Sequence, residues 1–299
     1  MKKPNFIISG FPKCGTTSLH HYLNEHPQIF MPSQKELHFF TFKIISKLKS
    51  GPKDKIVKET QIDSSEKYLR FYKNIKNELA IGDTSPSYIN YPSEFLKIKE
   101  YLNDPKIIIV LRDPINRAYS NYLHLKREQR ETLSFNEAID AEEERIKNKY
   151  SDFWYYKFNS TYFEKVVKAK EVFSDVLILT IEQLNKNPEK TIKQVCQFLK
   201  VDDSFKIEQI SRKFNLGGNY KINLITKILF QPSWFKNRIK RVIKPTPFIK
   251  IILMKLSSFF ISKPETIDDE TLTHLTKYFK EDVAKLKNIS VDTSNWREY

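Results

Sequence analysis

Phe6-Ile7-Ile8-Ser9-Gly10-Phe11-Pro12-Lys13-Cys14-Gly15-Thr16-Thr17-Ser18-Leu19 is the stretch that decides the fold of this chain. An apolar strand leads into a turn bracketed by two glycines, and an amphipathic helix follows. Gly10 and Gly15 have the spacing of a phosphate-binding P-loop, but the lysine stands at position 13 instead of directly after Gly15. The unpaired amides of the first helical turn still predict a site for an anion.

Short apolar runs recur along the first two thirds of the chain and are separated by segments with helical periodicity. They are Phe6–Ser9, Leu79–Gly82, Lys106–Leu111 and Val176–Thr180. Near-continuous apolar runs are typical of parallel strands that are covered on both faces. The alternation predicts an α/β fold, a central parallel β-sheet flanked by helices, with ligands bound beyond the carboxyl ends of the strands.

The pattern changes after about residue 216, and we expect one domain over residues 1–299 with three parts. Residues 1–215 form the α/β core, residues 216–265 a lid or acceptor-side helical segment, and residues 266–299 a helical appendage that packs on the core. Apolar residues at helical spacing predict the last helix from about Asp268 to Leu286. They are Leu272, Leu275, Phe279, Val283 and Leu286.

The charge balance favours anionic partners. The 299 residues include 51 lysines and arginines against 36 acidic residues, which gives a net charge of +15. A polyphosphorylated cofactor, an acidic polysaccharide, a nucleic acid and a membrane surface would all fit this charge. Lysines spread over solvated helix faces explain it equally well, so charge alone does not choose among these partners.

The cysteines and the apolar stretches indicate in which cellular compartment the protein is expected. Cys14 and Cys196 fall in different predicted elements and provide neither a disulfide framework nor a zinc site. No signal peptide is recognisable at Met1, and the apolar stretch Phe248–Ile261 is interrupted by lysines and too short to span a bilayer. We expect a soluble, cytoplasmic protein.

A second anion site is predicted where another strand meets a helix. Arg112 ends an apolar strand, Asp113 suits the N-cap and Pro114 the first helical position. Ser120 follows on the helix, on one face with Arg117 and His124. A guanidinium with a hydroxyl suits a phosphate monoester. The alternative is that Arg112 pairs with an acid and that the serine is a surface hydroxyl.

With these two sites together, the sequence resembles the sulfotransferases that use 3′-phosphoadenosine-5′-phosphosulfate. Pro12–Leu19 look like the 5′-phosphosulfate loop of that family, and Arg112 with Ser120 eight residues later looks like its 3′-phosphate site. Three further motifs extend the resemblance: Lys35–Phe40, Gly82–Tyr88 and Asn215–Lys221. The last two are closest to the carbohydrate and heparan-type branch and its bacterial relatives.

The resemblance implies that the donor is 3′-phosphoadenosine-5′-phosphosulfate, that the product is adenosine 3′,5′-bisphosphate, and that no metal is required. The implied donor-binding residues are Pro12, Lys13, Cys14, Gly15, Thr16, Thr17, Ser18, Arg112, Ser120, Gly218 and Lys221. Lys13 would stabilise charge on the bridging oxygen. Glu36 would act as general base beside the acceptor, and His38 would contact the acceptor or the base, or only pack within its loop.

The implied acceptor is a hydroxyl of a carbohydrate, glycan-like or small molecule, with an amine as the second option. Thr84 stands where heparan-type relatives often carry lysine, which leaves the acceptor contacts open. Tyr88 would either stack on a sugar ring or belong to the core. His20 and His124 are weaker candidates, and thiol catalysis by Cys14 is not expected.

Two other functions remain open at this point. A P-loop nucleotide kinase shares the strand, loop and helix, although it would carry lysine after Gly15. A non-enzymatic binder of nucleic acid or anionic membrane would use the basic, aromatic segments Trp234–Arg241 and Phe248–Ile261. We favour a lid for this region, whose basic surface would recruit an acidic or membrane-linked acceptor, and we do not expect nucleic acid as a partner.

Overall fold

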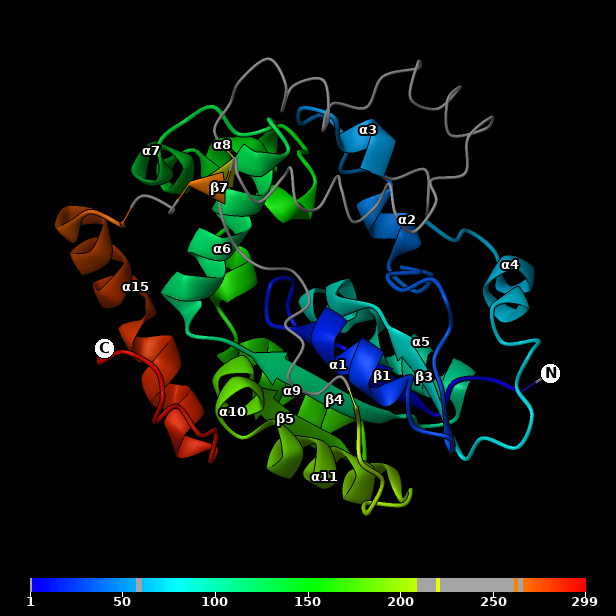
Figure 1. Ribbon diagram of the computed structural model, residues 1–299. Helices are drawn as coiled ribbons and strands as arrows, with labels where there is room; N and C mark the ends of the chain where they lie inside the picture. Colours follow the sequence, from blue (N-terminus) through cyan, green and yellow to red (C-terminus); the bar gives the residue numbers. More distant parts are fainter. Residues whose placement is uncertain (1, 58–60, 209–218, 221–260, 263–265) are drawn as a thin grey trace.

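A parallel five-stranded sheet forms the centre of the computed structural model, which describes residues 2–57, 61–208, 219–220, 261–262 and 266–299. The strands are β1 (Phe6–Ile8), β2 (Ile29–Phe30), β3 (Ala80–Thr84), β4 (Lys106–Leu111) and β5 (Val176–Thr180). Their order is β2-β3-β1-β4-β5, and every neighbouring pair is parallel. Helices flank this sheet (Figure 1), so the predicted α/β fold is confirmed.

The helices follow the strands along the chain. In the first part they are α1 (Thr16–Leu23), α2 (Phe42–Ile45), α3 (Asp54–Val57), α4 (Ser65–Arg70), α5 (Phe95–Leu102) and α6 (Pro114–Arg127). The later ones are α7 (Phe135–Asp140), α8 (Glu142–Lys147), α9 (Phe163–Val172), α10 (Ile181–Lys186), α11 (Pro188–Leu199) and α15 (Asp269–Asn288). Short 3₁₀ turns are η2 (Pro86–Asn90), η3 (Pro92–Glu94), η4 (Asp152–Trp154) and η5 (Phe158–Ser160).

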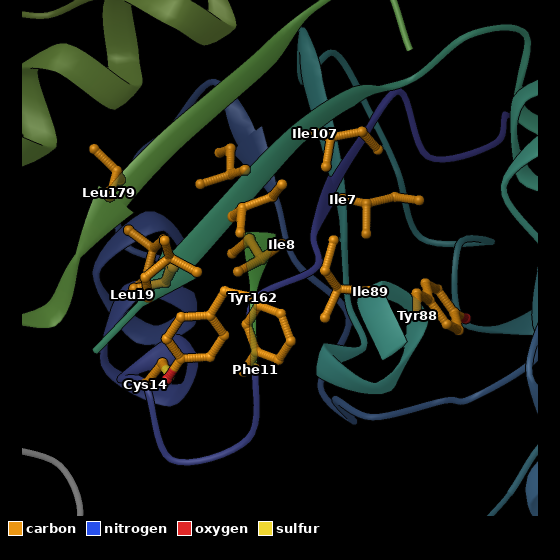
Figure 2. Close-up of a cluster of buried hydrophobic side chains, with 14 of the residues drawn as sticks. Ile7, Ile8, Phe11, Cys14, Leu19, Tyr88, Ile89, Ile107, Tyr162 and Leu179 are labelled. Atoms are coloured by element: carbon orange, nitrogen blue, oxygen red, sulfur yellow. The ribbon is translucent and has the colours of Figure 1, made fainter. Parts of the chain in front are cut away.

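The central strands are buried on both faces, as their apolar sequences predict. Ile7, Ile8 and Ile108 have no exposed surface, and Figure 2 shows Ile7 and Ile107 together in the core with Ile8 on the other side of the strand. The sequence prediction missed β2, because two residues carry too little periodicity. It also ended β3 too early: the strand continues through Asp83 and Thr84, since the buried carboxylate there receives hydrogen bonds from hydroxyl groups.

The predicted final helix is confirmed as α15. Asp268 caps it and accepts a hydrogen bond from the amide of Thr271 (2.8 Å). Its apolar stripe, which includes Leu275 and Phe279, is buried, and α15 packs against α6 and α9 (Figure 1). Of the predicted lid over residues 216–265, the structure describes only β6 (Asn219–Tyr220) and β7 (Ile261–Ser262), which pair antiparallel.

No helix in the described part of the chain is both long enough and apolar enough to span a lipid bilayer.

Candidate functional site

Three neighbouring strands end at one edge of the sheet, and each leads into a predicted site segment. In the register of the sheet, Ile8 of β1 lies beside Thr84 of β3 on one side and Ile108 of β4 on the other. Strand β1 has β3 as its neighbour on one side and β4 on the other, so the strand order changes direction at β1. Open α/β sheets bind ligands at such a position, beyond the carboxyl ends of the strands. The glycine-bracketed loop, Glu36 and Arg112 are therefore brought to one edge.

The two glycines of the loop have different physical roles. A Cβ atom on Gly10 would lie 2.8 Å from the backbone nitrogen and oxygen of Val110, so the loop can approach β4 this closely only with glycine. Gly15 has a φ of 92° and is the N-cap of α1. Its left-handed backbone turns the chain into the helix. The spacing of Gly10 and Gly15 thus shapes a tight turn between strand and helix.

The underside of the loop is apolar and closed to solvent. Phe11 and Cys14 are fully buried, and the ring of Phe11 lies 4.5 Å from that of Tyr162, centroid to centroid. Figure 2 shows Phe11, Cys14 and Tyr162 clustered together on the core side of the loop. Burial raises the pKa of the Cys14 thiol to about 12. The thiol is therefore neutral and packs in the core, which agrees with the sequence argument against thiol catalysis.

The loop ends at the N-terminus of α1, where amide groups are available to an anion. The first amide that donates to an acceptor in the helical pattern is that of Leu19, to the carbonyl of Gly15 (3.2 Å). The amides before it, from Thr16 to Ser18, precede the regular bonding of the helix and carry its positive end. Thr16 is buried, and Thr17 and Ser18 are half-buried. This end of α1 can hold a phosphate-sized anion.

Arg112 joins the second predicted site to the first. Its Nη1 donates to the carbonyl oxygen of Lys13 (3.1 Å), and its own carbonyl accepts from the hydroxyl of Tyr162 (3.0 Å). Asp113 caps α6 by accepting from the amide of Asn116 (2.8 Å), as predicted. The arginine is half-buried, so its charge lies beside the loop.

Arg117 has a different role from the one that helical spacing suggests. It is fully buried, and its guanidinium donates to Ser160 Oγ (2.7 Å), Asn121 Oδ1 (3.0 Å) and the carbonyl of Tyr156 (3.1 Å). A longer bond of 3.4 Å reaches the carbonyl of Pro12. Arg117 therefore supports the loop from below, whereas the next turn of α6 presents half-buried side chains, those of Ser120 and His124.

Glu36 and His38 lie in a segment that is bound to the end of β3. The amide of Glu36 donates to the carbonyl of Thr84 (2.7 Å), and His38 Nδ1 is 2.7 Å from Ser87 Oγ. Both residues have positive φ angles, 60° and 55°, and Lys13 has 73°. Left-handed backbone is uncommon for side chains of this size. Such conformations cluster at functional sites, and all three proposed catalytic residues adopt one.

Lys13 lies in a positive environment. Burial and, to a smaller extent, the charges of Arg127, Arg112 and Lys35 together lower its pKa to about 8, against the opposing effect of Glu36. Arg127 is not among the residues predicted for the site from the sequence. It lies at the end of α6, and its Nη2 is 2.8 Å from Nδ1 of His124. The one available sign was its position three residues after His124 on the same helix.

Glu36 is held ionised by its surroundings. Burial alone would raise its pKa, but the charges of Lys35, His38 and Lys13 outweigh burial and lower it below the usual range for glutamate. Its carboxylate forms an ion pair with the Lys35 ammonium. At neutral pH the group is therefore an unprotonated carboxylate, which is the form that can accept a proton.

The residues after β3 form a buried support for this segment. Asp83 accepts hydrogen bonds from the hydroxyls of Tyr68 (2.8 Å), Ser85 (2.7 Å) and Tyr88 (3.1 Å). Tyr88 is fully buried, so it belongs to the core and does not offer its ring to a sugar. Ser85 in turn lies 3.4 Å from the amide of His38. Asp83 and its hydroxyl partners therefore help to orient the segment that carries Glu36 and His38.

Three further residues considered from the sequence are not placed at the site formed by the loop, Glu36 and Arg112. They are His20, Gly218 and Lys221. Nδ1 of His20 is 2.9 Å from the hydroxyl of Thr84, and burial lowers the pKa of His20 to about 4, so its ring is neutral at physiological pH. Gly218 and Lys221, the predicted loop over the 3′-phosphate, lie outside the described residues.

Comparisons with known proteins agree with this geometry. A sequence model described as "Sulfotransferase family" matches residues 4–204, which hold the whole five-stranded sheet. A sulfotransferase crystal structure from Alicyclobacillus acidocaldarius superposes with a TM-score of 0.77 at 29% identity, over 100% of both chains. The sulfotransferase domain from the curacin biosynthetic pathway gives 0.50 at 15% identity over 100% of both chains and supports the fold alone.

Two curated relatives also match. The membrane-associated sulfotransferase kil1 of Dictyostelium discoideum is 36% identical over 119 residues, 40% of this chain and 22% of that protein. Carbohydrate sulfotransferase 15 of Mus musculus is 27% identical over 243 residues, 66% of this chain and 43% of that protein. The chain thus spans less than half the length of these relatives. Since the family model covers more than half of the chain, the protein belongs to the sulfotransferase family.

Proposed function

We propose that this protein transfers a sulfuryl group from 3′-phosphoadenosine-5′-phosphosulfate to a hydroxyl of a carbohydrate acceptor, with an amine as the second option. The observation that carries the proposal is the bond from Arg112 to the carbonyl of Lys13 (3.1 Å), because it unites two anion sites at one sheet edge. The carbohydrate acceptor is supported by the relative named carbohydrate sulfotransferase 15.

The residues present fit a donor with phosphates at two ends. The amides at the start of α1 offer donors to one anionic group, and Arg112 with Ser120 offers a guanidinium and a hydroxyl to another. When bound, the donor supplies a sulfuryl group attached to a phosphate leaving group. Lys13 would then place its ammonium where negative charge develops on the leaving oxygen.

Glu36 would act as the general base for the acceptor hydroxyl. Its carboxylate is ionised and lies on the segment bound to the end of β3, within electrostatic range of Lys13. It would take the proton from the acceptor hydroxyl as that oxygen forms its new bond to sulfur, while His38 would hold the acceptor or the base. Positioning these groups on backbone fixed by hydrogen bonds supplies the in-line orientation that transfer requires.

The experiment that tests this function is direct turnover. Purified protein is mixed with the donor and a panel of glycans, and mass spectrometry follows both the sulfated acceptor and adenosine 3′,5′-bisphosphate. We expect both products in equal amounts without added Mg²⁺. Magnesium-dependent turnover of ATP, with no sulfated product from any acceptor, would instead support a nucleotide kinase.

Arg112→Ala is expected to weaken binding of adenosine 3′,5′-bisphosphate by about a hundredfold, since charge-assisted bonds contribute about 1.5–3 kcal/mol each. Isothermal titration calorimetry measures the change. The control is Arg70→Ala on α4, an exposed arginine that pairs with Glu66 on its own helix. Unchanged binding by Arg112→Ala would contradict the placement of the 3′-phosphate.

The pH dependence should reflect Lys13. We expect kcat/KM for the donor to fall as the pH rises through about 8, because the lysine of the free enzyme loses its charge above its pKa. In Lys13→Arg the decline should move to higher pH, since guanidinium stays charged. Initial rates at low donor concentration give the profile, and an identical decline in both proteins would assign it to another group.

Two expectations stay predictions. They are the cytoplasmic location and the recruitment of an anionic or membrane-linked acceptor. The basic segments that motivate the second, Trp234–Arg241 and most of Phe248–Ile261, lie outside the described residues.

A further inference from the structure

The turn between β4 and α6 determines how Arg112 leaves the sheet. β4 ends at Leu111 and α6 begins at Pro114, so only Arg112 and Asp113 separate them. Arg112 itself is held through its carbonyl by Tyr162 and through its side chain by the carbonyl of Lys13. The remaining restraint on the turn comes through Asp113, whose side chain is almost fully buried.

A segment far along the sequence holds this aspartate. Arg297 follows α15, and its Nε lies 3.0 and 3.2 Å from the two carboxylate oxygens of Asp113. Its amide also donates to Asp113 (3.2 Å), and its Nη2 donates to Asn116 Oδ1 (2.8 Å). One residue thus contacts both the cap and the first turn of α6. Bonds between charged groups of this kind are the stronger ones in proteins.

The neighbouring residue of the same segment reinforces the contact. Trp296 Nε1 donates to one oxygen of Glu182 (3.0 Å), and the amide of Asp113 donates to the other (3.2 Å). Glu182 lies on α10, which also bonds to the segment through Gln183 and Asp292 (2.9 Å). Figure 1 shows the red segment after α15 lying alongside α10. The turn is therefore held between α10 and residues 292–297.

This arrangement affects the charge of the site as well as its geometry. Asp113 is directly next to Arg112 in sequence, and an unpaired carboxylate there would compete with a phosphate for the guanidinium. Arg297 occupies both carboxylate oxygens of Asp113, while Arg112 bonds to a neutral carbonyl. Asp113 can cap α6 with the bond from the amide of Asn116 alone. The contacts of Arg297 with Asp113 are therefore not needed for capping.

We propose that Arg297 is a positioning residue for donor recognition: it fixes the β4–α6 turn and neutralises Asp113, which leaves Arg112 oriented and available for the 3′-phosphate. The inference rests on the proposed function, because it assumes that Arg112 reads that phosphate. It predicts that Arg297 contributes to discrimination between nucleotides with and without a 3′-phosphate, although Arg297 does not itself contact the nucleotide.

The test compares affinities for adenosine 3′,5′-bisphosphate and adenosine 5′-monophosphate by calorimetry in the full chain. The ratio of the two affinities isolates the 3′-phosphate. We expect Arg297→Ala to lower this ratio by about tenfold while affinity for the monophosphate stays within about twofold, and Arg297→Lys to fall between. In the Arg112→Ala background, Arg297→Ala should lower the ratio no further.

Different outcomes separate this inference from the proposed function. Equal losses for both nucleotides in Arg297→Ala, or additive losses in the double variant, would overturn the positioning role and leave only a contribution to stability. A ratio that Arg112→Ala leaves unchanged would overturn the proposed 3′-phosphate site and the inference with it. Melting temperatures identify a variant that fails to fold, in which case Arg297→Lys carries the comparison.

Discussion

Lys13→Ala should lower kcat for sulfuryl transfer by about a thousandfold, the effect of removing one group that stabilises developing charge at a reacting oxygen. The structure motivates this size of effect. Lys13 has a φ of 73° in a loop whose neighbouring carbonyls are held by Arg112 and Arg117. A lysine in that backbone conformation is maintained by its surroundings, and burial lowers its pKa toward neutrality.

The measurement is single-turnover kinetics with saturating donor, which separates the chemical step from binding. Lys149→Ala is the matched control, because Lys149 has a φ of 56° but is exposed in the loop after α8. We expect the control to turn over at the wild-type rate. A Lys13→Ala protein that loses affinity for the donor but keeps its rate of transfer would show that Lys13 only binds.

Glu36→Gln is the second variant with a large expected effect, a fall in kcat of about 10²–10⁴-fold, the range for loss of a general base. Glutamine preserves the size of the side chain but cannot take a proton. Affinity for adenosine 3′,5′-bisphosphate should change little, because Glu36 lies on the acceptor side in this account. The pKa of Glu36 is below its usual range, so the wild-type protein should keep this base unprotonated throughout the neutral range.

Steady-state kinetics with an identified acceptor, together with calorimetry for the bisphosphate, tests both statements. Glu189→Gln on α11 serves as a control, since Glu189 is an exposed residue outside the site. Near-normal kcat in Glu36→Gln would remove Glu36 from the mechanism and direct attention to His38 and His124.

The fold, and the strand ends and helix starts at which the two anion sites are proposed, could be predicted because local sequence determines them. Buried parallel strands are continuous apolar runs, and the glycine spacing reports a tight turn before α1. Asp113 before Pro114 marks a helix start from two residues alone. Each of these signals lies within a few residues of the feature it predicts, and the structure contains each feature.

What could not be predicted depends on contacts between distant segments. Helical spacing places Arg117 beside Ser120, but only the packed structure shows its guanidinium bonded to Ser160 and buried. The contact between Arg297 and Asp113 joins residues 184 positions apart. Glu36 has a positive φ, and its amide donates to the carbonyl of Thr84, 48 positions further along the chain at the end of β3. Local sequence patterns cannot predict contacts between residues that are far apart in the chain.

In the proposed site, the loop at Lys13 and the Arg112 site together hold one nucleotide with phosphates at both ends. The decisive experiment is calorimetric titration of the full chain with adenosine 3′,5′-bisphosphate and, separately, with ATP and Mg²⁺. We expect the bisphosphate to bind at least about a hundredfold more tightly, a difference of about 2.7 kcal/mol. Tighter binding of ATP with Mg²⁺, or equal binding of both nucleotides, would contradict it.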